Sequence, residues 1–150
     1  DEPVVVLFFG DHWPKLEDGF NQAVLKGYNV FTDMYRVPFF IWANYPLEGQ
    51  EIEAVSLNYL SGLLLRAADI EGTPYTNYLE QLRKDIPVVT DIGVMDSLGD
   101  FYVSGGYKPP AVSKKLREYS ILQYNNSFDD SRRSKSLFYL EEPYAMRLNK

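Results

Sequence analysis

The strongest constraint on the fold is an unbroken run of apolar residues at positions 4–9, close to the start of the chain. The run contains only valine, leucine and phenylalanine, and it predicts a β-strand. A strand with one solvent-exposed face alternates apolar and polar residues. An unbroken apolar run is typical of a strand buried on both faces, usually in a parallel sheet. Gly10 and Pro14 then mark a loop.

The patterns in the rest of the first half predict helices and a second strand. Leucines at three- and four-residue spacing indicate one helix, for which Ser56 is the expected N-cap. Thr73 and Pro74 are typical of the start of another helix. The predicted elements are a buried strand at residues 38–43 and helices near residues 20–27, 56–69 and 73–86.

The character of the chain changes after Pro87. The predicted elements there are short strands at residues 88–89, 101–103 and 137–140, with a helix at residues 113–124. The sequence therefore predicts an α/β fold. Residues 1–86 are expected to form a parallel-sheet part, and residues 87–150 a small α+β subdomain.

Composition excludes several classes of function. The 150-residue chain has a formal charge of −6, which argues against a nucleic-acid binder. It contains no cysteine, so disulfides, thiolate metal sites and cysteine nucleophiles are excluded. No glycine-rich phosphate loop or nucleophile elbow is present. No apolar stretch reaches the length of a membrane span.

Asp11 and His12 form the one candidate site, directly after the first predicted strand. Ligands of open parallel sheets bind beyond the carboxyl ends of the strands. A carboxylate beside an imidazole suits manganese, magnesium or zinc. A metal site needs three or four ligands, however, and nothing requires Glu17 or Asp18 to complete this one. The alternative is that Asp11 caps the following turn and His12 packs under Trp13.

Two further features have ordinary structural explanations. The carboxylate pairs Glu51/Glu53 and Glu141/Glu142 are typical of exposed loop and helix ends. Most of the twelve tyrosines fall on apolar helix faces and predict core packing, except that the hydroxyls of Tyr119 and Tyr124 are expected to reach the surface.

At Gly10-Asp11-His12 the sequence resembles the metal-binding strand of the sulfatase-like branch of the alkaline phosphatase superfamily. Residues 37–45, 60–67, 78–82 and 118–124 extend the likeness in the same order. Together they resemble the C-terminal part of lipoteichoic acid synthase-like phosphoglycerol transferases, over nearly the whole chain. Trp13 departs from the pattern, because many sulfatase-like members have glycine there.

The resemblance implies that Asp11 and His12 bind one divalent cation, commonly manganese, with magnesium or zinc as alternatives. It also implies a threonine nucleophile upstream of this chain, so no catalytic residue is assigned within it. Family members are anchored in the cell membrane and act on its extracellular face. They move glycerophosphate from phosphatidylglycerol to a cell-envelope polymer.

The sequence therefore predicts part of a larger metal-dependent enzyme. The substrate is expected to be a phospholipid headgroup or another phosphodiester or sulfate ester, not nucleic acid. The isolated piece is expected to be soluble, inactive and weak in metal affinity. The alternatives are a sulfuric-ester or phosphodiester hydrolase of the same superfamily, and a non-catalytic domain that binds a glycan or a protein.

Overall fold

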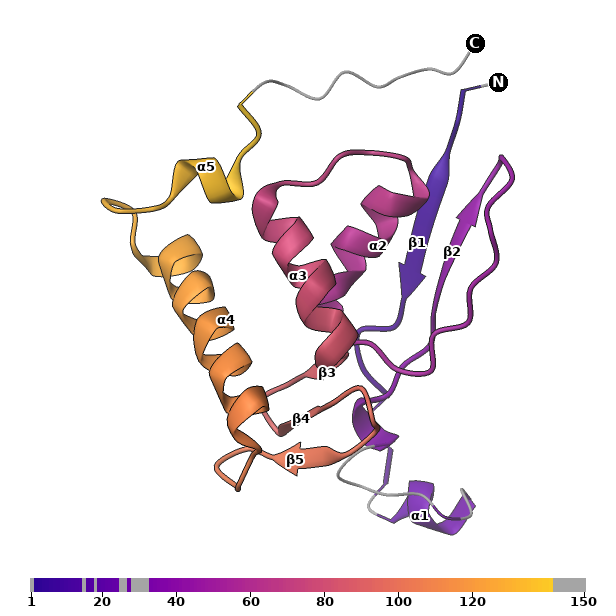
Figure 1. The fold of residues 1–150 in the computed structure, drawn as a ribbon. Helices are drawn as coiled ribbons and strands as arrows, with labels where there is room; N and C mark the ends of the chain where they lie inside the picture. The colour runs from indigo at the N-terminus through magenta and orange to yellow at the C-terminus, as the bar shows by residue number, and fades with distance from the viewer. Residues whose placement is uncertain (1, 15, 18, 25–26, 28–32, 142–150) are drawn as a thin grey trace. The chain divides into compact units, whose positions relative to one another are not determined.

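The computed structural model describes residues 2–14, 16–17, 19–24, 27 and 33–141. The chain divides into two compact units, Asp1–Glu48 and Gly49–Lys150, and each unit has its own small sheet (Figure 1).

The first unit is built on a ribbon of two strands. Strand β1 (Val5–Phe9) pairs antiparallel with β2 (Phe39–Ala43), so that the Cα atoms of Phe9 and Phe39 face each other. A short helix, α1 (Phe20–Val24), and a 3₁₀ turn, η1 (Asp33–Tyr35), lie between the two strands in sequence. Both strands consist almost entirely of β-branched and aromatic residues, which pack well on a pleated surface.

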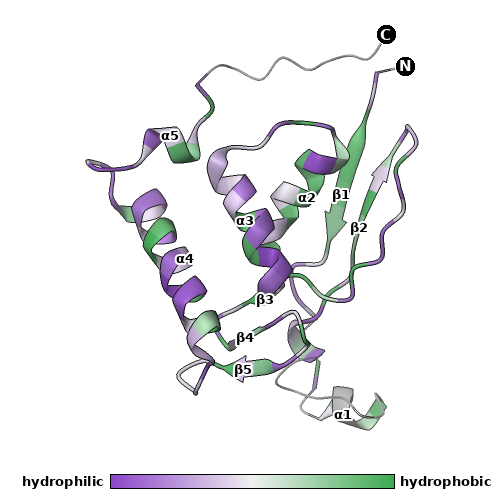
Figure 2. Ribbon diagram, viewed as in Figure 1, coloured by the Kyte–Doolittle hydropathy of each residue, from purple (hydrophilic) through white to green (hydrophobic). Residues whose placement is uncertain are grey.

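The two predicted strands exist, but β1 is not buried on both faces. Val6 and Phe8 on β1 are 45% and 53% exposed, and Phe40 and Trp42 on β2 are 54% and 53% exposed. Leu7 and Ile41, on the opposite face, are half-buried. Figure 2 shows how apolar β1 is along its length. In this chain only one face of the ribbon is partly covered, and all pairings between the described strands are antiparallel. The predicted parallel sheet is not among them.

The second unit combines helices with a three-stranded antiparallel sheet of order β3-β4-β5 (Figure 1). Its elements are η2 (Leu57–Tyr59), α2 (Leu60–Ala67), α3 (Pro74–Asp85), β3 (Val88–Val89), β4 (Gly93–Met95), β5 (Phe101–Val103), α4 (Pro110–Phe128) and α5 (Lys135–Phe138). The start of α3 is as predicted, because the Thr73 hydroxyl accepts a hydrogen bond from the Thr76 amide at 3.2 Å. No described helix has both the length and the hydropathy needed to cross a membrane.

The core of the second unit centres on Tyr59 and Ile86, whose side chains are 1% and 0% exposed. The Tyr59 hydroxyl donates a 2.8 Å hydrogen bond to the Ile86 carbonyl, which joins η2 to the end of α3. Burial raises the pKa of Tyr59, so this donor stays protonated. Residues packed around this pair come from α3, β4 and α4: Leu79, Leu82, Val94, Val112 and Tyr119. The predicted division between residues 86 and 87 falls inside this unit. The domain limits of the whole protein stay a prediction.

Residues 137–140 do not form the predicted strand. Residues up to Phe138 form the single-turn helix α5, and the Phe138 ring packs against the Tyr75 ring of α3 at 5.0 Å between centroids. The turn before α5 is held by Asn125, whose amide oxygen accepts from the Ser134 amide at 3.0 Å. These contacts between distant residues outweigh the local β-propensity of a Leu-Phe-Tyr-Leu run.

Ser56 lies at the start of η2, but its hydroxyl does not cap a helix. The hydroxyl donates to Asn58 Oδ1 at 2.5 Å and accepts from the Val89 amide at 2.9 Å. Ser56 therefore ties η2 to β3, and the predicted capping bond is absent.

Replacing Tyr59 by phenylalanine tests the importance of its hydrogen bond. Tyr59→Phe leaves the Ile86 carbonyl without its donor in the core, so the free energy of unfolding should fall by about 1–2 kcal/mol. Urea unfolding followed by far-UV circular dichroism measures this change. The control is Tyr107→Phe, because Tyr107 is 81% exposed and its change should stay within about 0.5 kcal/mol. Equal effects of the two substitutions would contradict the role of the bond.

Candidate functional site

The Asp11–His12 pair lies in the loop that follows the carboxyl end of β1, as the sequence predicts. Two hydrogen bonds fasten this loop to the segment that leads into β2. The Gly10 amide donates to the Pro38 carbonyl at 3.0 Å, and the Trp13 indole donates to the Arg36 carbonyl at 2.6 Å. The pair is therefore held between two anchored residues.

Gly10 is required for the close approach of these two segments. A Cβ atom at this position would lie 2.9 Å from Val37 Cβ, closer than carbon atoms pack. Only glycine lets the backbone after β1 run this close to Val37. The sequence signal for this contact is the glycine itself, placed between the strand and the aspartate.

Asp11 and His12 are oriented by bonds to the backbone. The His12 amide donates to Asp11 Oδ1 at 2.8 Å, and His12 Nδ1 lies 2.7 Å from the Trp13 carbonyl. A carbonyl can only accept, so Nδ1 carries the proton in the neutral ring and Nε2 keeps its lone pair. Nε2 lies 3.4 Å from Asp11 Oδ2. The carboxylate oxygen and the imidazole nitrogen therefore lie close together.

The alternative arrangement, with His12 packed under Trp13, is wrong. The side chains of His12 and Asp11 are 75% and 83% exposed. His12 contacts the backbone carbonyl of Trp13 at 2.7 Å, and its ring remains open to solvent. An exposed pair of ligand-type atoms is free to bind something that approaches from outside.

The geometry of the pair fits two ligands of one divalent cation. Metal-bound nitrogen and oxygen lie about 2.0–2.2 Å from zinc, so two ligands of a tetrahedral ion lie roughly 3.3–3.6 Å apart. The observed Nε2–Oδ2 separation is 3.4 Å. Metal-binding histidines usually donate their other ring N–H to a carbonyl or carboxylate, as His12 Nδ1 does here.

The pair does not form a complete site by itself. Among the residues that the structure describes, no group of three or more histidine, cysteine, aspartate or glutamate side chains could hold a metal. Asp18 lies outside the described residues. The described residues therefore supply two ligands, and a full coordination sphere needs others.

The other carboxylates considered in the sequence are surface groups. Glu51 and Glu53 are exposed, as is Glu141, and Glu142 lies outside the described residues. Tyr119 and Tyr124 are the tyrosines whose hydroxyls are expected to reach the surface. Tyr124 is 61% exposed, as expected, whereas Tyr119 is 5% exposed and packs in the core.

Sequence reasoning missed Asp96, a buried carboxylate in the β4–β5 hairpin. Asp96 accepts hydrogen bonds from the Tyr102 hydroxyl at 2.8 Å and from the Leu98 and Asp100 amides at 2.9 and 3.1 Å. The bond from Tyr102, followed by the backbone bonds, lowers the pKa of Asp96, and Asp96 in turn raises the pKa of Tyr102 to about 12. All these partners belong to one turn, so Asp96 stabilises the hairpin.

Glu80, on α3, is the second carboxylate that sequence reasoning missed. Its carboxylate pairs with the Arg66 guanidinium of α2, and Arg83 lies 3.7 Å away. Gly62 makes room for it, because a Cβ there would lie 2.8 Å from Glu80 Oε1. Glu80 therefore joins α2 to α3 and has a structural role.

Comparison with known proteins connects the first part of the chain to a class of enzymes. Residues 1–70 match the sulfatase family, and this segment contains β1, the Asp11–His12 pair and β2. Over 137 residues the chain is 24% identical to a protein of Rhizobium meliloti (strain 1021) whose name describes it as a cyclic beta-1,2-glucan modification protein. The alignment covers 85% of this chain and 21% of that relative, so the chain spans about a fifth of its length. No solved structure matches the chain significantly.

These findings support a sulfatase-like superfamily, and with it an enzyme, for the part of the chain that carries the candidate site. The finer assignment to lipoteichoic acid synthase-like transferases stays a prediction.

Substituting Gly10 tests the anchoring of the loop that carries Asp11 and His12. In Gly10→Ala the new methyl group meets Val37, which should lower the free energy of unfolding by about 1–3 kcal/mol. Trp13 and Trp42 are the two tryptophans of the chain, so urea unfolding followed by tryptophan fluorescence reports on the first unit. The control is Glu48→Gln, which changes an exposed residue of the same unit and should alter stability by no more than about 0.5 kcal/mol. A Gly10→Ala variant as stable as this control would contradict the close approach.

The pKa shift of Asp96 predicts the pH dependence of stability. A carboxyl group with a lowered folded pKa stabilises the fold above its unfolded pKa of about 4, and this contribution is lost as the pH falls through the folded pKa. Urea unfolding at pH 6, 4 and 3 should show a loss of stability that is smaller in Asp96→Asn. Asp91→Asn, which changes an exposed aspartate, should keep the wild-type pH dependence. Identical pH profiles for wild type and Asp96→Asn would refute the role of Asp96.

Proposed function

We propose that this chain supplies two metal ligands, Asp11 and His12, to an enzyme of the sulfatase-like superfamily. The reaction is the transfer of glycerophosphate from phosphatidylglycerol to a cell-envelope glycan. The observation that carries the proposal is the open Asp11–His12 pair, with 3.4 Å between His12 Nε2 and Asp11 Oδ2. This pair lies inside the segment that matches the sulfatase family.

The residues of the chain have separate roles in this proposal. Asp11 Oδ2 and His12 Nε2 hold the cation, for which manganese is the first candidate and magnesium or zinc the alternatives. When bound, the cation neutralises charge on a phosphodiester and lowers the pKa of the attacking hydroxyl group. The Trp13 carbonyl keeps the His12 proton on Nδ1, and Gly10 fixes the loop against the segment before β2. The nucleophile, a threonine, comes from outside this chain.

The similar protein from Rhizobium meliloti supports a glycan as the acceptor, since its name describes modification of a cyclic glucan. A phospholipid donor places the enzyme at a membrane. We propose that the whole protein is anchored there and acts on the outer face. A sulfatase-like hydrolase would use the same ligands but would pass the group to water. The two reactions therefore differ in the acceptor of the transferred group, which is a glycan in the transferase and water in the hydrolase.

Metal binding and transfer can be tested together on the full-length protein. In Asp11→Asn and His12→Ala, we expect the affinity for Mn²⁺, measured by isothermal titration calorimetry, to fall at least roughly 10–100-fold. Transfer of radiolabelled glycerophosphate from phosphatidylglycerol to a glucan acceptor should be lost with it. Because the described residues offer two ligands, the 150-residue chain alone should bind Mn²⁺ weakly.

The control variant is Glu48→Gln, which changes an exposed carboxylate in the same unit and should bind and transfer as the wild type does. Unchanged Mn²⁺ affinity in both ligand variants would refute the metal site. Intact metal binding with label released as free glycerophosphate, and none on the glucan, would favour the hydrolase.

A further inference from the structure

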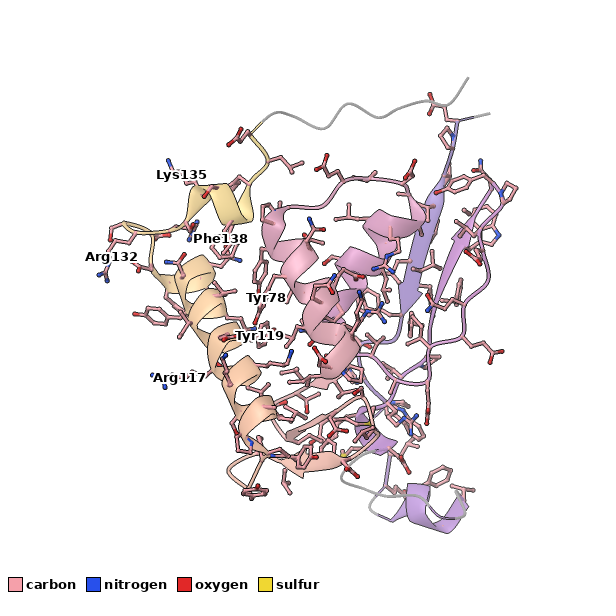
Figure 3. The ribbon with its side chains drawn as sticks, viewed as in Figure 1. Tyr78, Arg117, Tyr119, Arg132, Lys135 and Phe138 are labelled. Carbon is pink, nitrogen blue, oxygen red and sulfur yellow. The ribbon has the colours of Figure 1, made fainter. Side chains whose placement is uncertain are left out.

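Helix α4 presents apolar residues on two opposite faces. Val112, Leu116 and Tyr119 recur at four- and three-residue spacing and pack into the core of the second unit. In Figure 3, Tyr119 lies between α4 and α3, close to Tyr78 of α3. A surface helix normally has one apolar face and one polar face. The outward face of α4 departs from this rule.

The outward face carries a continuous row of five residues, which we call the outer stripe: Lys114, Arg117, Ile121, Tyr124 and Phe128. Their spacing of three and four residues places them on one side of the helix, opposite the buried side. Ile121, Tyr124 and Phe128 are 58%, 61% and 75% exposed. The rings of Tyr124 and Phe128 pack on each other at 5.6 Å, so they form one apolar surface.

The charge around the outer stripe has the opposite sign to that of the chain. Residues 108–135 contain seven of the fifteen basic side chains and three of the twenty-one acidic ones, a net charge of +4 in a chain of −6. Among the described residues Arg117 makes no ion pair. Lys114 lies 4.0 Å from Glu118 Oε1, and its side chain is 79% exposed. Figure 3 shows Arg117 and Arg132 extending away from α3. The stripe is therefore apolar at one end and cationic at the other.

The size of the stripe argues against a protein partner. Three partly exposed side chains on one convex helix offer on the order of 400 Å² of surface, about half of what each partner contributes to a stable protein interface. A bilayer surface has no such minimum, because an interfacial helix only needs to insert its apolar residues about 5–10 Å into the headgroup region. Basic side chains beside the apolar ones then contact anionic headgroups.

We propose that the outer stripe of α4 docks on the surface of an anionic lipid bilayer. Ile121, Tyr124 and Phe128 insert between the headgroups, with the Tyr124 hydroxyl at the water boundary. Lys114 and Arg117 bind lipid phosphates at the same level. This surface belongs to the second unit, whereas Asp11 and His12 belong to the first, so docking does not depend on a bound metal.

Vesicle co-sedimentation tests the proposal with the 150-residue chain. We expect at least tenfold stronger binding to vesicles of 30% phosphatidylglycerol in phosphatidylcholine than to phosphatidylcholine alone, and weaker binding at 300 mM than at 50 mM NaCl. Arg117→Glu should weaken binding by at least about fivefold, since each basic residue near an anionic surface contributes roughly that factor. Phe128→Ser should also weaken it. Leu98→Ser, which removes an 85% exposed residue outside the stripe, should have no effect.

A fluorescent label separates docking from a general electrostatic attraction. The chain has no cysteine, so Phe128→Cys and Ser127→Cys each provide one labelling site. These neighbours differ by about 100° around the helix. A polarity-sensitive label at 128 should shift to the blue on phosphatidylglycerol vesicles, and a label at 127 should shift much less.

Two results would overturn the proposal. One is equal binding to both kinds of vesicle by wild type and the stripe variants. The other is a concentration-dependent dimer in analytical ultracentrifugation that Phe128→Ser abolishes, because the stripe would then bind a second copy of the chain.

Discussion

The antiparallel pairing of β1 with β2 positions the candidate metal ligands. The ladder ends where the Gly10 amide bonds to Pro38, and the absence of a side chain at Gly10 lets Val37 lie against the backbone. Asp11 and His12 follow at once, so their placement results from the ladder and not from a network of their own. This explains why two exposed side chains are nevertheless oriented: backbone groups of the loop fix Asp11 Oδ1 and His12 Nδ1 and leave the other atom of each for a ligand.

The carboxylates of Asp96, Glu80 and Asp11 differ in the groups that contact them. Asp96 and Glu80 are buried. Asp96 accepts a hydrogen bond from the Tyr102 hydroxyl, and Glu80 pairs with the Arg66 guanidinium. A buried carboxylate without such partners would destabilise the fold, so these contacts follow from burial. Asp11 is exposed, with one oxygen held by an amide and the other facing an imidazole. Availability to a ligand distinguishes the candidate site from the structural carboxylates.

Local patterns predicted most elements and the position of the Asp11–His12 pair directly after a strand. They failed where contacts between residues distant in sequence determine the structure. The apolar runs gave the strands at 5–9 and 39–43, and capping by Thr73 gave the start of α3. Such patterns do not show whether two strands pair parallel or antiparallel, because an apolar run is compatible with both arrangements. The short strand β4 was missed because Gly93 reads as a loop residue, whereas the close packing of Phe101 and the Tyr102 carbonyl requires glycine there. The helix α5 depends on the contact of Phe138 with Tyr75, 63 residues earlier in the chain.

The two proposed surfaces lie in parts of the chain with different relationships to known proteins. The sulfatase match ends at residue 70, just after α2, and contains the candidate pair Asp11–His12. Helix α4 lies beyond the end of this match. Asp11 and His12 are ligand-type side chains whose chemistry does not select a lipid over another ester. Under the proposed function the donor is a phospholipid, so a surface that docks on the bilayer would add to the proposed membrane anchor of the whole protein. The outer stripe of α4, apolar at one end and cationic at the other, has the chemistry for that task.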